Sequence, residues 1–267
     1  MVASEYLRPK DFEEAYNLMI ESKKNYLVAG GAWLKLSVKS AEKLISLDGL
    51  DLDKIQVNTD YIEIGSMVTL RTVEINNDIK NLYGGILSNA IHKIMGINIR
   101  NLATLGGSVM GKFAFSDIFP ALLVLNTKLV FYKQGEICLE DFLANPKMAK
   151  DILTKIIIKK EPGEGFFKKV AITPLDFSVL NIAVSKNKEG FKISVGSTPY
   201  IAKLATNAMS YINNLSKITE TEILKCSEMV VEELKFSKNN RGSKEYRVEI
   251  AKVYVKRGLK KVIANES

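Results

Sequence analysis

Hydrophobic and polar residues recur along this chain with two different periods. Apolar residues at helical spacing follow Asp11, which can cap a helix together with Glu14 three positions later. Short runs rich in β-branched and aromatic residues predict strands instead. Helices are expected over residues 11–22, 84–95, 117–125, 206–213, 220–233 and 243–260, and from Thr69 onward. Strands are expected over residues 25–28, 43–47, 55–57, 61–64, 128–132, 152–158, 166–172, 178–184 and 191–195.

The order of these segments predicts an α+β protein with two domains. Strands and helices are mixed as far as residue 160, and an antiparallel meander followed by helices occupies the rest. A flexible turn rich in glycine and proline at residues 161–165 marks the boundary. A chain of 267 residues is long enough for two compact domains. We therefore expect domains at residues 1–160 and 161–267.

Two glycine pairs stand out in the first domain. Gly30 and Gly31 follow the strand at 25–28 and precede a helix-prone stretch, an arrangement that suits a pyrophosphate at a helix N-terminus. Gly106 and Gly107 follow Thr104. Paired glycines can adopt positive φ and approach a ligand closely, and their amide N–H groups can surround a phosphate. On spacing alone, a plain turn between two buried elements explains the second pair equally well.

The second glycine pair also has a partial match to a phosphate-binding P-loop. Residues 106–112 fit the first seven positions of that motif, including the lysine. The eighth position is Phe113, where the motif needs a serine or threonine hydroxyl to hold Mg²⁺. No long strand-like run precedes the glycines either, so we regard a P-loop nucleotide site as a weak alternative.

Composition narrows the chemistry of the chain. Its two cysteines, Cys138 and Cys226, and its single histidine, His92, are too few and too far apart for an iron–sulfur or zinc site, so no metal site and no catalytic residue are expected. The net charge of +8 comes from widely spread lysines without a nucleic-acid-binding motif, which predicts a solvated basic surface or, second, a face that docks a partner subunit.

Two further absences bear on location. No apolar run approaches the length of a membrane span, and the N-terminus lacks the pattern of a signal peptide. We therefore expect a cytoplasmic protein that binds neither membrane nor nucleic acid.

Residues 99–108, Ile-Arg-Asn-Leu-Ala-Thr-Leu-Gly-Gly-Ser, are followed by Asp117 thirteen positions after Thr104. This stretch resembles the FAD-binding signature of the molybdenum hydroxylases, in the flavoprotein domain or medium subunit of the xanthine dehydrogenase and CO dehydrogenase family. The resemblance covers nearly the whole chain. Four further segments share it: residues 29–34 with the first flavin loop, 64–70 with Ile-Gly-Ala-x-Val-Thr-Leu, 151–158 with the segment that places a leucine near the flavin, and 246–247 with a Tyr-Arg pair.

The resemblance implies a two-lobed FAD-binding domain of the vanillyl-alcohol-oxidase/PCMH type, followed by a small C-terminal α+β domain. In it, backbone N–H groups of both glycine loops would surround the pyrophosphate, and Asp117 would accept hydrogen bonds from ribityl or ribose hydroxyls. Lys169 matches the lysine of a Phe-x-Lys strand, and Lys168 matches almost as well. The residues implied to bind FAD are Leu27, Val28, Ala29, Gly30, Gly31, Ala32, Trp33, Leu34, Leu102, Thr104, Gly106, Gly107, Ser108, Asp117, Leu153 and Lys169.

The chain departs from the family pattern at several positions. Ala32 and Trp33 replace the usual Thr-Asp, which removes two side-chain hydrogen-bonding groups from the first loop. Ser108 stands where asparagine is usual. Ile172 and Thr173 replace arginines, which weakens any inference about a nicotinamide acceptor.

The function implied by the resemblance is electron transfer within a complex. Partner chains, a molybdopterin-binding large subunit and a [2Fe–2S] small subunit, would oxidise the substrate and supply electrons, and FAD on this chain would pass them to NAD or another acceptor. The protein would then be an FAD-dependent, xanthine dehydrogenase-like subunit that is active only within its complex. The alternatives are a stand-alone flavin oxidoreductase of the same fold and a scaffold subunit that has lost its flavin, which the Ala32–Trp33 departure keeps open.

Overall fold

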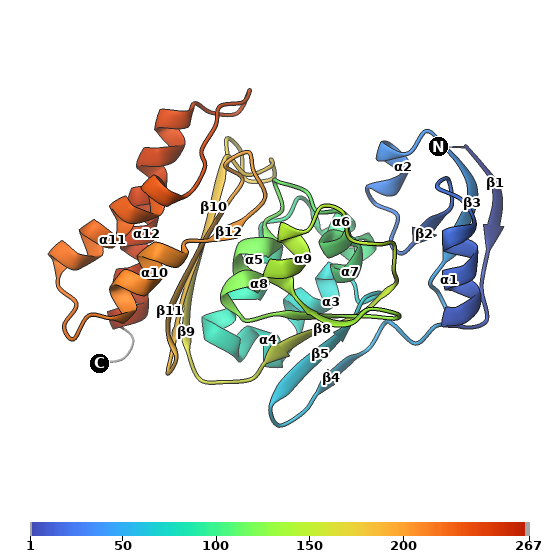
Figure 1. The fold of residues 1–267 in the computed structure, drawn as a ribbon, viewed down its shortest axis with the longest axis horizontal. Coiled ribbons are helices and arrows are strands. Elements are labelled where there is room, and N and C mark those ends of the chain that lie inside the picture. Colours follow the sequence, from blue (N-terminus) through green and yellow to red (C-terminus); the bar gives the residue numbers. More distant parts are fainter. Residues whose placement is uncertain (1, 265–267) are drawn as a thin grey trace. The chain divides into compact units, whose positions relative to one another are not determined.

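The computed structural model describes residues 2–264, apart from the side chains of Lys35 and Ser37. The chain forms two compact units, and it passes between them several times (Figure 1). Unit 1 consists of residues 1–73, 96–111 and 127–158, and unit 2 of residues 74–95, 112–126 and 159–267. Both units combine sheets with helices, so the expected α+β class is confirmed. The described residues form no helix that combines the length and the hydropathy needed to cross a bilayer.

Unit 1 begins with a parallel three-stranded sheet. Its strands are β1 (Val2–Leu7), β3 (Ser40–Ser46) and β2 (Tyr26–Val28), in the order β1-β3-β2. The helix α1 (Phe12–Glu21) packs Ala15 and Met19 against Ile45 of β3. The side chain of Asp11 accepts a hydrogen bond from the Glu14 amide at 2.8 Å, which confirms the predicted helix start. Strand β1 was not predicted, because its sequence Val-Ala-Ser-Glu-Tyr-Leu has little apolar pattern.

The second sheet of unit 1 has five strands in the order β4-β5-β8-β6-β7. Asp151 fixes the turn after β6, because its buried carboxylate accepts hydrogen bonds from the backbone amides of Lys133, Gln134 and Ile152. The elements of this part are β4 (Ile55–Val57), β5 (Tyr61–Gly65), β6 (Lys128–Phe131), β7 (Gly135–Cys138), α9 (Leu139–Ala144) and β8 (Leu153–Lys159).

Three short helices complete unit 1, and a fourth joins it to unit 2. They are α2 (Leu34–Ser37), α6 (Ile97–Leu102) and α7 (Leu105–Met110), with α3 (Leu70–Ile75) running across the division. Both α6 and α7 overlap residues 99–108, the stretch that resembles the FAD-binding signature and is called the second loop below.

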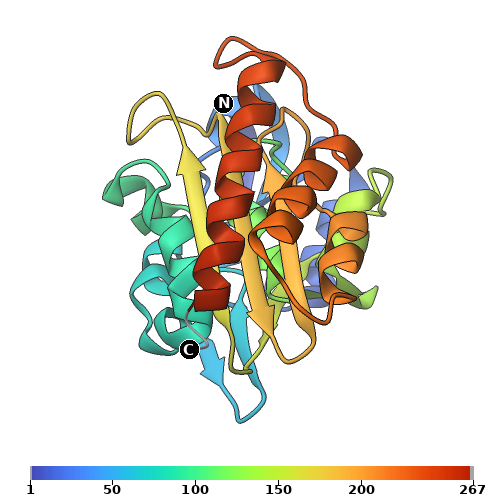
Figure 2. The ribbon, with the colours of Figure 1, turned by 90° about the vertical axis from the view of Figure 1, so that its left-hand side faces the viewer.

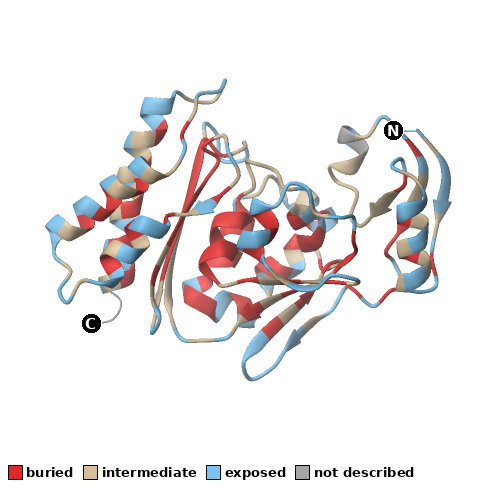
Figure 3. Cartoon of the chain, in the orientation of Figure 1, coloured by how far each residue is buried: buried red, intermediate tan, exposed pale blue. Residues whose placement is uncertain are grey.

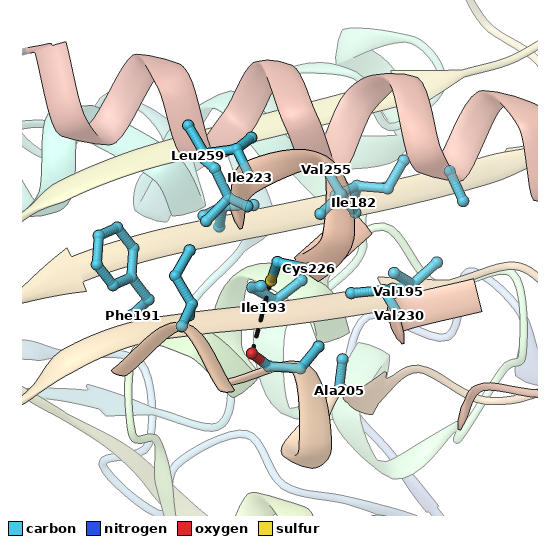
Figure 4. Close-up of a cluster of buried hydrophobic side chains, with 14 of the residues drawn as sticks. Ile182, Phe191, Ile193, Val195, Ala205, Ile223, Cys226, Val230, Val255 and Leu259 are labelled. Carbon is cyan, nitrogen blue, oxygen red and sulfur yellow. Dashed lines mark hydrogen bonds between the residues drawn. The ribbon is translucent and has the colours of Figure 1, made fainter. Parts of the chain in front are cut away.

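Unit 2 is built on an antiparallel sheet with helices on both faces. Its strands are β9 (Glu164–Val170), β10 (Leu180–Asn187), β11 (Gly190–Gly196) and β12 (Lys203–Leu204), in the order β12-β11-β10-β9. Figure 2 shows the long helix α12 (Lys244–Ala264) lying over the sheet beside α10 (Thr206–Asn213) and α11 (Glu220–Glu233). The core between them joins Ile182 and Ile193 to Val255 and Leu259, and the Cys226 thiol donates to the carbonyl oxygen of Ala208 (Figure 4).

The other face of this sheet packs on α8 (Ile118–Val124), which is buried along its whole length (Figure 3). Side chains of β10 alternate between the faces, so Ile182 points to the helices α10–α12, whereas Ser185 donates to the Val124 carbonyl of α8 at 2.9 Å. The alternation matters for the candidate site because it places Asn181 on the α8 side.

The prediction of one helix over residues 84–95 was wrong in extent. The structure has α4 (Asn77–Asn81), a 3₁₀ turn (Leu82–Gly85) and a shorter α5 (Ile86–His92). Tyr83, Gly84 and Gly85 all have positive φ, so no right-handed helix can continue through them. The helix ends at His92, and Met95 also has a positive φ of 40°.

Hydrogen bonds and close packing hold residues 161–165 in place, so this segment is not the flexible turn that was predicted. The carboxylate of Glu161 accepts hydrogen bonds from the Tyr83 hydroxyl at 3.0 Å and from Asn187 Nδ2 at 2.8 Å. Gly163 and Gly165 lie directly against Tyr83. Long-range polar contacts, which local composition does not reveal, account for the difference. The domain boundary at residue 160 stays a prediction.

Candidate cofactor-binding site

The first glycine pair forms a loop between β2 and α2 in unit 1. Gly31 has a φ of +65°, a left-handed conformation that glycine adopts without strain. Gly30 is required for a different reason, because any Cβ there would overlap the carbonyl oxygen of Leu102. The loop therefore touches the backbone of the segment that carries the second glycine pair.

The second glycine pair lies inside a helix and is not a turn. Thr104 is the N-cap of α7, and its Oγ1 accepts a hydrogen bond from the Gly107 amide at 3.0 Å. Gly106 and Gly107 have helical φ, so the expectation of positive φ at this pair was wrong. Gly106 is needed for space, since a Cβ there would lie 2.5 Å from the Ser66 side chain.

Gly107 brings the two loops face to face. A Cβ on Gly107 would lie 2.9 Å from Thr104 Oγ1, and its next neighbour would be Ala29 of the first loop at 4.0 Å. A side chain at position 107 would therefore crowd Thr104, and the side of α7 next to Ala29 carries none there.

The two loops differ in the hydrogen-bond donors that they offer. The amides of Leu105, Gly106, Gly107 and Ser108 donate to Val68 O, Ser66 O, Thr104 Oγ1 and Thr104 O, at 2.9 to 3.0 Å. Among the described residues, the amides of residues 29–32 donate to no acceptor. The donors available for an anion thus lie in the first loop, and Gly107 of the second loop adds no side chain beside them.

This arrangement fits the pyrophosphate of FAD. It offers consecutive amide N–H groups without acceptors in a loop next to Gly107, and unit 1 has equal numbers of acidic and basic residues, so no excess of negative charge opposes the binding of an anion. The remaining predicted residues of unit 1 have different surroundings. Leu153 is buried in β8, Leu102 is 43% exposed at the end of α6, and Trp33 and Leu34 are half-buried with contacts of their own.

Asp117 and Lys169 belong to unit 2, where the structure brings them together. Lys169 Nζ lies 3.0 Å from Asp117 Oδ2 and donates a second hydrogen bond to the Lys93 carbonyl at 2.8 Å. Both side chains are about 5% exposed. Lys168 points to the opposite face of β9, where its ammonium lies 5.2 Å from the Tyr254 ring. Of the two lysines, Lys169 is therefore the one that meets Asp117.

Two residues that the sequence analysis missed complete this cluster. The Ser178 hydroxyl and Asn181 Nδ2 both donate to Asp117 Oδ1, the latter at 2.9 Å. Asn181 Nδ2 also donates to the Ser116 carbonyl at 3.1 Å. The sequence feature that could have identified Asn181 is its polar side chain within the apolar run of the strand predicted at 178–184.

Lys169 and Asp117 together retain one hydrogen-bond donor and one hydrogen-bond acceptor that a further group could use. An ammonium has three N–H donors, and two of those on Lys169 are used. Oδ2 of Asp117 receives one hydrogen bond and can accept another. A hydroxyl both donates and accepts, so this pair matches the chemistry of a polyol such as the ribityl chain of FAD.

Comparison with known proteins identifies the family of the chain. Residues 2–160 match the family described as the FAD binding domain in molybdopterin dehydrogenase, and residues 165–262 match the CO dehydrogenase flavoprotein C-terminal domain. The uncharacterized protein YgfM of Escherichia coli is 28% identical over 199 residues, which cover 72% of this chain and 73% of that protein. The glyceraldehyde dehydrogenase medium chain of Sulfolobus acidocaldarius is 22% identical over 274 residues, covering 96% of this chain and 97% of that one.

Solved structures share the fold at low sequence identity. Carbon monoxide dehydrogenase from Hydrogenophaga pseudoflava superposes with a TM-score of 0.87 at 20% identity, with 97% of each chain covered. Quinoline 2-oxidoreductase from Pseudomonas putida gives a TM-score of 0.85, again at 20% identity over 97% of each chain.

The fold and the matched domains thus define a flavoprotein chain with an FAD-binding domain. The chain belongs to the family of FAD-binding medium subunits of the molybdopterin hydroxylases, the CO dehydrogenase flavoprotein family.

Proposed function

We propose that this chain is the electron-transfer subunit of a molybdenum hydroxylase complex, which binds FAD and delivers electrons from iron–sulfur clusters on a partner chain to NAD or another acceptor. The observation that carries the proposal is that, within the described part of the chain, the amides of residues 29–32 have no acceptor, in a loop whose Ala29 lies beside Gly107. A chain that had lost its flavin would be under no requirement to keep these donors unpaired.

In this proposal, residues of the two units bind different parts of FAD. The amides of the first loop bind the pyrophosphate, and Gly107 keeps the adjoining space free of side chains. Asp117 and Lys169 bind a hydroxyl of the ribityl or ribose groups. The other proposed contacts are Leu27, Val28, Trp33, Leu34, Leu102, Thr104, Gly106, Ser108 and Leu153. We further propose residues 1–160 as the FAD-binding domain and 161–267 as the C-terminal domain.

Bound FAD supplies both one- and two-electron transfer, which is the chemistry needed between iron–sulfur clusters and a two-electron acceptor. The chain itself binds and orients. Among the described residues, no group of three or more histidine, cysteine, aspartate or glutamate side chains could hold a metal ion. Substrate oxidation is therefore assigned to a molybdopterin-binding large subunit, and electron supply to a [2Fe–2S] small subunit.

The substrate of the complex depends on the partner chains. The relatives reported above carry the names of dehydrogenases for carbon monoxide and glyceraldehyde and of an oxidoreductase for quinoline. We propose a purine-oxidising, xanthine dehydrogenase-like complex as one candidate beside these. Assaying the chain with its co-expressed partners on an aldehyde, a purine and an N-heterocycle would identify the class.

The test of cofactor binding is direct. The purified chain is denatured and the released flavin is identified by chromatography. FAD at about one per chain is expected, whereas FMN alone, or no flavin after incubation with FAD, contradicts the proposal and supports the flavin-free scaffold.

A second assay separates the subunit from a stand-alone oxidoreductase. The isolated chain is expected to reduce a dye with NADH, if NAD is its acceptor, but not to oxidise hypoxanthine or nicotinate. Substrate-dependent NAD⁺ reduction by the isolated chain would overturn the assignment as a subunit.

A further inference from the structure

The carboxylate of Asp117 has more protein partners than binding a ligand requires. Three donors, from Ser178, Asn181 and Lys169, meet its two oxygens in the interior of unit 2. Asp117 is the N-cap residue of α8, but its side chain makes no capping hydrogen bond. Capping the helix, the commonest structural reason for an aspartate at this position, therefore does not explain the cluster.

We infer that Ser178 and Asn181 are positioning residues of the flavin site that act through Asp117 on Lys169. The inference rests on the proposed function. Both residues bind Oδ1, which fixes the rotation of the carboxylate and leaves Oδ2 for Lys169 at 3.0 Å. Lys169 Nζ is thereby held between Oδ2 and the Lys93 carbonyl, so its remaining N–H has a defined direction.

The placement of Asn181 supports a role beyond packing. Its amide nitrogen must face Asp117 Oδ1 and Ser116 O, because both are acceptors. Its Oδ1 is then left fully buried without a hydrogen-bond partner among the described residues. An unsatisfied buried carbonyl lowers stability, so an apolar residue would serve the strand better. The chain retains an asparagine, as expected if its nitrogen has a task.

Gly196 on the neighbouring strand β11 makes the room for this amide. Asn181 and Gly196 are paired residues of β10 and β11, and any Cβ on Gly196 would overlap Asn181 Oδ1. The substitution Gly196→Ala would therefore displace the Asn181 amide from its present position without altering any group of the cluster itself.

The experiment measures FAD affinity of the apoprotein by quenching of flavin fluorescence, alongside its melting temperature without FAD. Ser178→Ala is expected to weaken FAD binding roughly tenfold, because a hydrogen bond to a charged group is lost. Ser178→Thr keeps the hydroxyl and should restore the affinity. In an Asp117→Ala background, Ser178→Ala should have no further effect, since Ser178 acts through the missing carboxylate.

Gly196→Ala provides a second route should Ser178→Ala fail to fold. It should also weaken FAD binding roughly tenfold, and again only when Asp117 is present. A merely structural role would lower the melting temperature of the apoprotein and leave the affinity changes additive.

The possible outcomes distinguish the inference from the function on which it rests. Unchanged affinity in Ser178→Ala, or equal losses with and without Asp117, overturns the positioning role while wild-type FAD binding upholds the proposed function. Failure of the wild-type chain to bind FAD overturns the proposed function first.

Discussion

Gly30 and Leu102 are in direct contact, with the Leu102 carbonyl oxygen occupying the space where a side chain at position 30 would begin. The contact joins the loop after β2 to the end of α6, which lie about 70 residues apart in the sequence. It places the unused amides of the first loop beside α7 and so sets the spacing of the candidate pyrophosphate site.

Gly30→Ala is expected to destabilise the chain strongly. The new Cβ meets a backbone carbonyl that cannot rotate away, so the backbone must shift at a cost of about 3 kcal/mol, the upper part of the range for overpacking. Urea unfolding followed by circular dichroism measures the effect. Gly96→Ala is the matched control, since Gly96 has no atom within 4 Å of the added Cβ and an ordinary φ. Equal stability of the two variants would contradict the contact.

Gly107→Val should remove FAD binding while the fold survives. Its side chain enters the space between Thr104 Oγ1 and Ala29 where we place the pyrophosphate. Because φ is helical at this position, little backbone strain is added, and the expected loss of stability is about 1 kcal/mol from crowding at the N-cap, where the added Cβ lies 2.9 Å from Thr104 Oγ1. Flavin content per chain is measured, with Gly96→Val as control. A folded Gly107→Val protein with full flavin content would move the site elsewhere.

Glu161 should make the stability of the chain depend on pH in the acid range. Burial raises the pKa of its carboxyl, but hydrogen bonds from Lys159, Tyr83 and Asn187 outweigh burial and hold the pKa below the ordinary value of 4.5. A lowered pKa in the folded state stabilises the fold above pH 4.5, and this contribution is lost as the pH falls through the folded-state value.

The comparison is between the wild type and Glu161→Gln. We expect the variant to be about 1–3 kcal/mol less stable at neutral pH, with a difference that shrinks below pH 4.5. Glu189→Gln is the control, because Glu189 pairs with the same Lys159 but is half exposed. A difference that is constant between pH 3 and 7 would show that the ionised carboxylate of Glu161 has no special role.

Arg247 should be sensitive even to replacement by lysine. Its fully buried guanidinium donates to the carbonyl oxygens of Val179, Ser237 and Gly242 and to Asn239 Oδ1, at 2.6 to 3.0 Å. Burial and the nearby Arg241 lower the pKa of this group. A lysine cannot reach four acceptors in this planar pattern, so Arg247→Lys is expected to cost about 3 kcal/mol of unfolding free energy.

Arg257→Lys is the control for this change, because Arg257 is exposed on the same helix. Its effect should stay within about 0.5 kcal/mol. Thermal unfolding of both variants measures the difference. Equal melting temperatures would mean that the hydrogen bonds of Arg247 contribute little net stability.

The sequence alone determined the α+β class and the FAD-binding family. Local signals sufficed for most elements, such as the Asp11 cap of α1 and the apolar runs of β8 and β10. The spacing of Thr104, the glycines and Asp117 pointed to flavin because a recognition motif is a local arrangement of residues. Because the predictions relied on local signals, a segment with a weak apolar pattern such as β1 was not predicted.

Only the tertiary structure decided what each residue of the candidate site does. The sequence suggested positive φ for both glycine pairs, yet Gly107 is helical and its importance lies in the space toward Ala29. It suggested amide donors from both loops, yet those of the second loop are already paired with Ser66, Val68 and Thr104. Asn181 reaches Asp117 across 64 positions of sequence. Such contacts depend on how segments distant in the sequence pack against one another, which local spacing does not encode.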